Sequence, residues 1–201
     1  MNIQTKPTFF VFTALLFILV LAACGDSGPK PTPTEARLTI WDFEKVCRQG
    51  VVGKAAAYEP AAGNVHPIVL FERDSAGENS YSSMSNILLK LPEPWVVAYD
   101  GQPETVELVA CITRVSEEFV ETCEFEDDEN EEKTYLLDVH NASYEVKVFA
   151  ATTGEEVGST TLEAAYEKCP MFHMFSEEKE ETFAPLEGGD LQAFLEQYVA
   201  P

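Results

Sequence analysis

The central part of the chain alternates apolar and polar side chains, and this pattern limits the fold more than any other feature. Between residues 104 and 115, Val106, Leu108, Ala110 and Ile112 occupy every second position. Successive side chains of a β-strand point to opposite faces, so this spacing is typical of a strand with one face in a core. Other segments rich in β-branched and aromatic residues are 66–72, 95–99, 119–125, 134–139, 144–151 and 156–162.

The links between these segments are short, and this decides how the strands pair. Thr152-Thr153-Gly154-Glu155 has a glycine where a hairpin turn needs positive φ. Parallel neighbours require a crossover of a dozen or more residues, so strands joined by short links are antiparallel. The sequence therefore predicts a meander of about five antiparallel strands between about residues 104 and 162.

Helical spacing is clearest near the C-terminus, in residues 190–199, with Asp190 as the N-cap. The apolar side chains of this segment share one face, namely those of Leu191, Phe194, Leu195 and Tyr198. Residues 39–49 are a second candidate helix with Thr39 as the cap, although their apolar residues suit a strand nearly as well. The predicted fold class is α+β, a mainly antiparallel β-sheet with a C-terminal amphipathic helix.

The N-terminus has the pattern of an export signal. The apolar run of residues 9–23 follows the single base Lys6 and is shorter than the roughly 20 residues of a membrane-spanning helix. It ends in Leu21-Ala22-Ala23-Cys24, which resembles the lipobox of bacterial lipoproteins. The resemblance implies that residues 1–23 are removed and that Cys24 becomes lipidated. Its acyl chains would then hold the protein in the bilayer, on the extracytoplasmic face of the cell membrane.

Residues 24–36 would begin with this lipidated cysteine and continue as a tether. Three prolines, two glycines and no large apolar side chain follow Cys24, so the segment cannot bury enough surface to fold. Residues 37–201 are then the single globular domain, which is large enough to sustain its own core.

Four cysteines lie in this domain, an even number in an oxidising compartment, and this predicts that disulfides stabilise it. A hairpin centred on Glu117 would place Cys111 opposite Cys123. Opposed strand residues lie about 4.5–5.5 Å apart between Cα atoms, a separation that a disulfide can span. The expected bonds are therefore Cys111–Cys123 and, by elimination, Cys47–Cys169.

The chain is strongly acidic, with 13 Lys and Arg residues against 35 Asp and Glu residues and a formal net charge of −22 at pH 7. This charge repels a phosphate backbone, so it excludes nucleic acid as a partner. Acids are densest in residues 117–132 and 177–181, which we expect to be a solvated hairpin tip and a loop. Neither run has the spacing of an EF-hand loop, so neither defines a calcium site.

The sequence has no G-x-S-x-G, H-E-x-x-H, C-x-x-C or phosphate-loop motif. His66 and His140 are isolated, and either would act as a general base only if folding brought it close to a carboxylate or a serine. An envelope hydrolase whose residues assemble only in three dimensions is therefore the first alternative to a binding function.

A second alternative is copper handling by the segment Cys169-Pro170-Met171-Phe172-His173-Met174. A thiol, two thioethers and an imidazole are soft ligands of the kind that select Cu(I). Met171, His173 and Met174 are the candidate ligands. If Cys169 forms a disulfide instead, these residues are packing residues and no cofactor is expected.

Tyr81 is the candidate ligand contact, because it lies in the polar segment 77–85, where we expect a tyrosine to be more exposed than in a strand. The lack of a catalytic motif, together with the anchor, favours a non-enzymatic function. The chain is expected to be a binding or interaction module of the cell envelope, with an envelope protein or ligand as its partner.

We expect the protein to fractionate with membranes because its acyl chains insert into the bilayer. A Cys24→Ser variant should leave an uncleaved or soluble form, and immunoblotting of membrane and soluble fractions measures this. Recovery of the wild-type protein as an unmodified soluble species that begins after residue 24 would exclude the lipoprotein interpretation.

Overall fold

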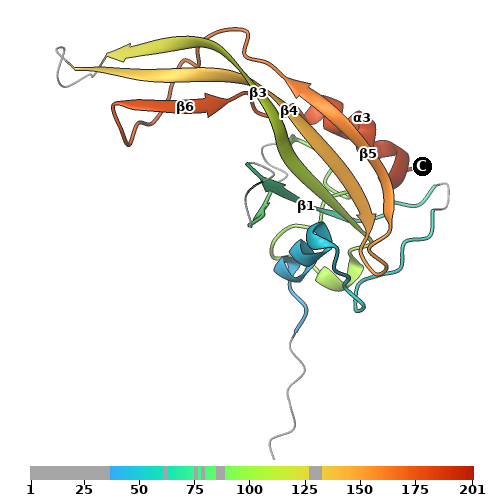
Figure 1. Ribbon diagram of the computed structural model, residues 1–201. Coiled ribbons are helices and arrows are strands. Elements are labelled where there is room, and N and C mark those ends of the chain that lie inside the picture. The colour runs from blue at the N-terminus through green and yellow to red at the C-terminus, as the bar shows by residue number, and fades with distance from the viewer. Residues whose placement is uncertain (1–36, 61–62, 75–76, 78–79, 85–88, 127–132) are drawn as a thin grey trace, which may run out of the picture. The chain divides into compact units, whose positions relative to one another are not determined.

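The computed structural model describes residues 37–201 except 61–62, 75–76, 78–79, 85–88 and 127–132. The chain divides into two units, Met1–Arg37 and Leu38–Pro201, and the elements below belong to the second (Figure 1). The export signal, Cys24 and the tether lie outside the described residues. Of the helices in the described part, none is long and apolar enough to cross a membrane.

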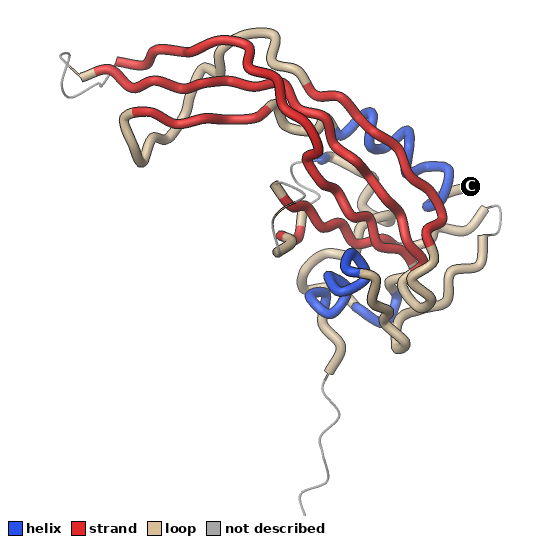
Figure 2. The backbone as a smooth tube through the Cα atoms, viewed as in Figure 1, coloured by secondary structure: helices blue, strands red, loops and turns tan. Residues whose placement is uncertain are grey.

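The sheet is mainly antiparallel and helices are few, which confirms the α+β prediction (Figure 2). The elements are the 3₁₀-helix η1 (Ile40–Arg48), β1 (Ile68–Arg73), β2 (Ser82–Ser83), the 3₁₀-helix η2 (Pro103–Thr105), β3 (Leu108–Glu126), β4 (Thr134–Ala150), β5 (Glu156–Ala164), β6 (Lys179–Phe183) and α3 (Gly188–Val199). The strands lie in the order β2-β1-β3-β4-β5, and β6 also pairs with β4. The β1–β3 and β4–β6 pairs are parallel, and the other pairs are antiparallel.

The predicted meander consists of three long strands rather than about five shorter ones. β3 continues through Ser116-Glu117-Glu118, where the hairpin turn was predicted, and β4 continues through residues 141–143. The pairing of β3 with β4 instead slips between Arg114 and Ser116 and between Phe119 and Glu121. Val115 and Val120 are the extra residues of these two bulges, which absorb the polar segment without ending the strand. The loop with Gly154 is confirmed, at φ 69°.

The neighbours of β3 and β4 change along their length. β1 pairs only with residues 108–113 of β3. On the other side, β4 pairs with β6 through Leu136–His140 and with β5 through Ala142–Phe149. We call residues 115–126 of β3, residues 134–140 of β4 and the whole of β6 the distal half of the sheet. β6 was predicted as part of an acidic loop, and this was wrong because an edge strand with solvent on its sides can be polar on both faces.

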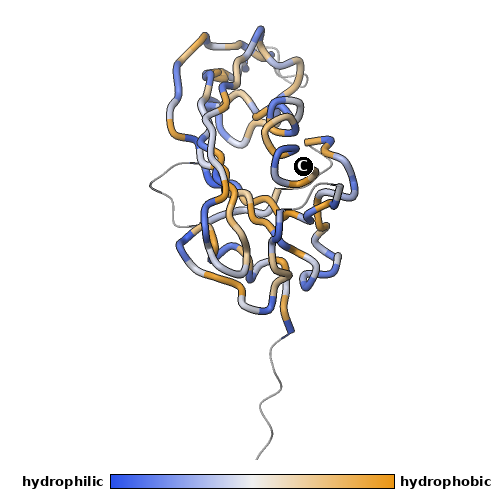
Figure 3. Tube along the Cα trace, turned by 90° about the vertical axis from the view of Figure 1, so that its right-hand side faces the viewer, coloured by the Kyte–Doolittle hydropathy of each residue, from blue (hydrophilic) through white to orange (hydrophobic). Residues whose placement is uncertain are grey.

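The remainder of the sheet is covered on both faces. Figure 3 shows that hydrophobic and hydrophilic stretches alternate along the chain. α3 covers one face with Leu191, Leu195 and Val199. The strand residues beneath it include Leu108, Ala110, Ile112, Tyr144, Val146 and Val148. η1 covers the other face, where Ile40, Phe43 and Val46 pack with Phe71 and Val109.

Both predicted helices are present, with changed boundaries. α3 begins at Gly188 instead of Asp190, and Glu187 is its N-cap. A Cβ atom on Gly188 would lie 1.8 Å from the Leu89 carbonyl oxygen, so only glycine allows this close approach. The 39–49 segment is helical, as η1, and the Thr39 N–H donates to Asp42 Oδ2 at 2.7 Å.

All four cysteines of the domain are bonded, as predicted, but the predicted pairing was wrong. The bonds are Cys47–Cys111 and Cys123–Cys169. The Cys111–Cys123 prediction required a turn at Glu117, whereas both cysteines lie on the continuous strand β3. At about 3.3 Å per residue they are about 40 Å apart along that strand, far beyond the reach of a disulfide. Cys47–Cys111 therefore fastens η1 to β3, and Cys123–Cys169 fastens the segment after β5 to the distal half.

Tryptic digestion of the unreduced protein should give residues 46–48 linked to residues 91–114, and residues 115–133 linked to residues 169–179. Cleavage after Arg114 separates Cys111 from Cys123, so mass spectrometry distinguishes the pairings directly. The bonded cysteines are 64 and 46 residues apart, and loops of this size stabilise by about 4 kcal/mol each in the chain-entropy model. A linked peptide that contains Cys111 and Cys123 would contradict the structure.

Candidate functional site

The predicted copper ligands lie between β5 and β6, on the segment that crosses one face of the distal half. Cys169 is bonded to Cys123, so its sulfur is not a thiolate ligand. His173 Nε2 lies 2.9 Å from Glu180 Oε2 and is therefore already hydrogen-bonded. Within the described ranges, no group of three or more His, Cys, Asp or Glu residues could hold a metal ion.

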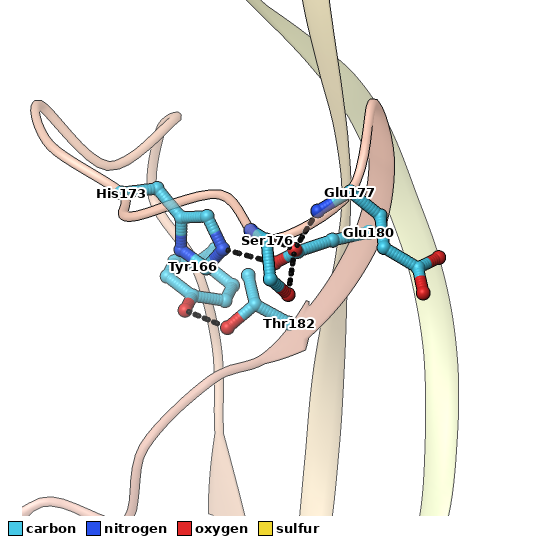
Figure 4. Close-up of polar contacts among 6 residues, drawn as sticks. All are labelled: Tyr166, His173, Ser176, Glu177, Glu180 and Thr182. Atoms are coloured by element: carbon cyan, nitrogen blue, oxygen red, sulfur yellow. Dashed lines mark hydrogen bonds and ion pairs between the residues drawn. The ribbon is translucent and has the colours of Figure 1, made fainter.

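Glu180 organises this segment by accepting hydrogen bonds on both carboxylate oxygens (Figure 4). Oε2 accepts from His173, and Oε1 accepts from the Ser176 N–H at 2.6 Å, the Ser176 hydroxyl at 2.8 Å and the Glu177 N–H at 2.8 Å. These bonds stabilise the charged form, with His173 as the largest cause, and they lower the pKa of Glu180 to about 2. The carboxylate therefore acts as a structural clamp on the chain that enters β6.

Ser176, His173 and Glu180 are the residue types of a hydrolase triad, but their connections differ from those of a triad. In a triad the imidazole accepts the serine proton and the carboxylate holds the far side of the ring. Here the serine hydroxyl and the imidazole both bond to the same carboxylate (Figure 4). Neither residue activates the other in this arrangement, which disfavours the hydrolase alternative at this position.

His66 is the second histidine that contacts a carboxylate. Its Nδ1 lies 2.7 Å from Glu107 Oε2, and its ring packs edge-on against Tyr58. His66 is 3% exposed, and Nε2 is buried with no hydrogen-bond partner among the described residues. A general base has to reach the proton it abstracts, so this buried ring is unsuited to act on a substrate.

His140, the other isolated histidine, lies inside β4. It pairs with Phe119 of β3 on one side and with Phe183 of β6 on the other. The three rings form one row across the distal half, with centroids 5.6 Å and 5.2 Å apart. The guanidinium of Arg114 lies 3.3 Å from the centroid of Phe183 and closes one end of the row.

Tyr81, the candidate ligand contact, was predicted to be exposed, and this was wrong. It is 7% exposed and packs in the cluster beneath η1. Its N–H donates to Glu44 Oε1 at 3.0 Å, and the Arg73 guanidinium lies 5.0 Å from its ring centroid. The polar residues around it gave the wrong signal because Ser82 and Ser83 pair with β1, which brings Tyr81 against the core.

A cleft of about 640 Å³ opens beside the start of α3. Its lining combines polar groups with apolar walls: Glu72, Met84, Leu89, Lys90, Pro185, Leu186, Glu187, Gly188, Gly189 and Gln192. Burial and, to a lesser extent, Asp74 raise the pKa of Glu72. These residues come from separate segments, so no sequence motif could have indicated the cleft. The described lining residues include no serine, threonine or cysteine that could act as a nucleophile.

The most exposed apolar side chains lie on residues 170–174, which we call the contact loop. Met171 is 93% exposed, Phe172 75% and Met174 79%. The loop is fixed on one side by Cys169 and on the other by the Glu180 clamp. Next to it, Phe175 stacks on Tyr135 with ring centroids 4.9 Å apart. The sequence singled out the two methionines as soft ligands, and it missed Phe172 because an isolated aromatic residue gives no signal of exposure.

No family model matches the chain, and no match was found among curated proteins or solved structures. The function therefore has to be inferred from the sequence and the structure of the chain itself.

Replacement of Glu180 with glutamine should destabilise the protein above about pH 4.5, because the amide cannot replace a charged acceptor of four hydrogen bonds. The pKa of Glu180 is lower in the folded state than in the unfolded chain, so its contribution is complete above the ordinary value. It is lost as the pH falls from about 4.5 to about 2. Urea denaturation across this range should show the two proteins converging at low pH.

Glu177→Gln is the matched control, because Glu177 contributes only its backbone N–H to the clamp. It should leave the free energy of unfolding nearly unchanged. An equal loss in both variants would show that the Glu180 carboxylate is not the clamp.

Proposed function

We propose that the protein is a membrane-anchored extracytoplasmic lipoprotein that acts as a binding module of the cell envelope, with the contact loop as its binding surface. The lipobox-like sequence before Cys24 supports the anchor. The exposure of Met171, Phe172 and Met174 on a fixed loop is the observation that carries the binding function.

This exposure needs an explanation, because soluble proteins seldom leave large apolar side chains together in water. Methionine and aromatic residues are enriched where proteins bind one another. The disulfide at Cys169 and the clamp at Glu180 order the loop before a partner arrives. An ordered loop loses little conformational entropy on binding, so more of the burial energy contributes to affinity.

The charge around the loop favours a protein partner over the bilayer surface. Residues 167–181 hold five glutamates against Lys168 and Lys179, and the side chains of Glu178 and Glu181 are 78% and 64% accessible. Anionic lipid headgroups would be repelled by these carboxylates. A protein with an apolar pocket and a neutral or basic rim would not.

The test is a photo-crosslinking amino acid at position 172 of the full-length lipoprotein, used in the membranes of the producing cells. Phe172 contacts the partner in this proposal, so we expect a protein adduct of one discrete mass. Thr161, exposed on β5, is the control position and should give no such adduct. Met171→Ser should reduce the yield from position 172 severalfold, because it removes neighbouring apolar contact. Adducts with lipid alone would contradict the proposal and indicate insertion into the bilayer.

A further inference from the structure

β3 presents an unpaired edge in the distal half. Among the described strands, its only neighbour beyond Thr113 is β4, because β1 ends its pairing there. Each residue from Val115 to Thr122 is exposed. Backbone groups of this segment that point away from β4 therefore face solvent, which is the template on which another strand can pair.

Three large apolar side chains lie on this edge. Val115 is 48% exposed, Phe119 55% and Val120 38%. Val115 and Val120 are the extra residues of the two bulges. Phe119 is at one end of the row of rings that it forms with His140 and Phe183. Between the bulges, Ser116–Phe119 stay in regular register with β4. The edge thus offers apolar anchors at both ends of a regular stretch.

The charged residues within this edge are all glutamates. Glu117, Glu118 and Glu121 lie between or beside them, and no Lys or Arg occurs from Val115 to Glu126. Arg114 lies 3.7 Å from Glu117, whereas no cation in the described part of the chain is within ion-pair distance of Glu118 or Glu121. Like charges directly opposed on paired strands are destabilising. A second copy of this edge would bring glutamate against glutamate, so self-pairing is disfavoured.

From these contacts we infer that the Val115–Thr122 edge is a docking surface for a basic, extended segment of another protein. Apolar residues of that segment cover Phe119 and Val120, its Lys or Arg residues neutralise Glu118 and Glu121, and its backbone pairs with β3. This surface is separate from the contact loop, so the inference goes beyond the proposed function. The inference also explains why the edge residues are acidic, because glutamates that repel a second copy attract a cationic strand.

The test measures peptide affinity by calorimetry, with the full chain purified from membranes in a neutral detergent. The probe is a peptide of alternating Lys and Val, with an alternating Glu-Val peptide for comparison. A third peptide has the Lys-Val sequence with N-methyl groups on alternate amides, which removes backbone pairing and keeps the charge. We expect only the first peptide to bind, and about tenfold more weakly at about 0.5 M than at about 0.05 M NaCl.

The double variant Glu118→Lys/Glu121→Lys should weaken this binding at least about tenfold. Phe119→Ser should weaken it as well. Glu155→Lys/Glu196→Lys makes the same change in net charge at exposed sites outside the Val115–Thr122 edge and should alter the affinity by less than about twofold. Unchanged thermal midpoints would show that the variants are folded.

The inference is overturned if the Lys-Val peptide does not bind, if both double variants weaken it equally, or if the N-methylated peptide binds as tightly. Met171→Ser should leave peptide affinity unchanged, since the contact loop is not part of this surface. Failure of crosslinking at position 172 therefore bears on the proposed function alone, and failure of the peptide experiment bears on the β3 edge alone.

Discussion

The antiparallel ladder between β3 and β4 is the constraint on which the rest of the structure depends. It runs from the Leu108–Ala150 pair to the Glu126–Thr134 pair with two bulges and no break. β1, β5 and β6 each pair with only part of this ladder, and α3 and η1 pack on the faces that the ladder forms. A slip of one residue would exchange the α3-facing and η1-facing residues, so the two different cores fix the register.

The two disulfides complement unequal cores. Near η1 and α3 the sheet is covered on both faces by large clusters, whereas the buried residues of the distal cluster are Cys123, Leu137 and Val139. A cluster of this size cannot hold a crossing segment by burial alone. The bond from Cys123 to Cys169 fastens that segment instead, with Glu180 and the stacked Phe175 beside it.

Sequence patterns predicted the features that depend on local chemistry. Gly154 marked a true hairpin, and the spacing of Leu191 and Leu195 marked a helix, because positive φ and a helical face are both properties of short segments. The turn predicted at Glu117 was wrong, because a polar triplet ends a strand only if the partner strand also ends. β4 continues past this triplet. The disulfide pairing failed with that turn. Burial of Tyr81 depends on contacts between segments, which no single segment encodes. Ser176, His173 and Glu180 lie within eight residues, but which of them bond to one another depends on how the chain turns into β6.

In the distal half, exposed apolar side chains and glutamates lie on the same strand edge, and together they determine what can bind there. Apolar residues on a free strand edge invite association with any other strand, and proteins commonly protect such edges with charges and bulges. β3 has both devices, yet it keeps Phe119 and two valines in solvent. Protection alone would be served better by polar residues at those three positions, since exposed valine and phenylalanine add aggregation risk. Apolar side chains beside glutamates suit a partner of the opposite charge, because the carboxylates set which strands can approach and the apolar side chains supply the affinity once they do.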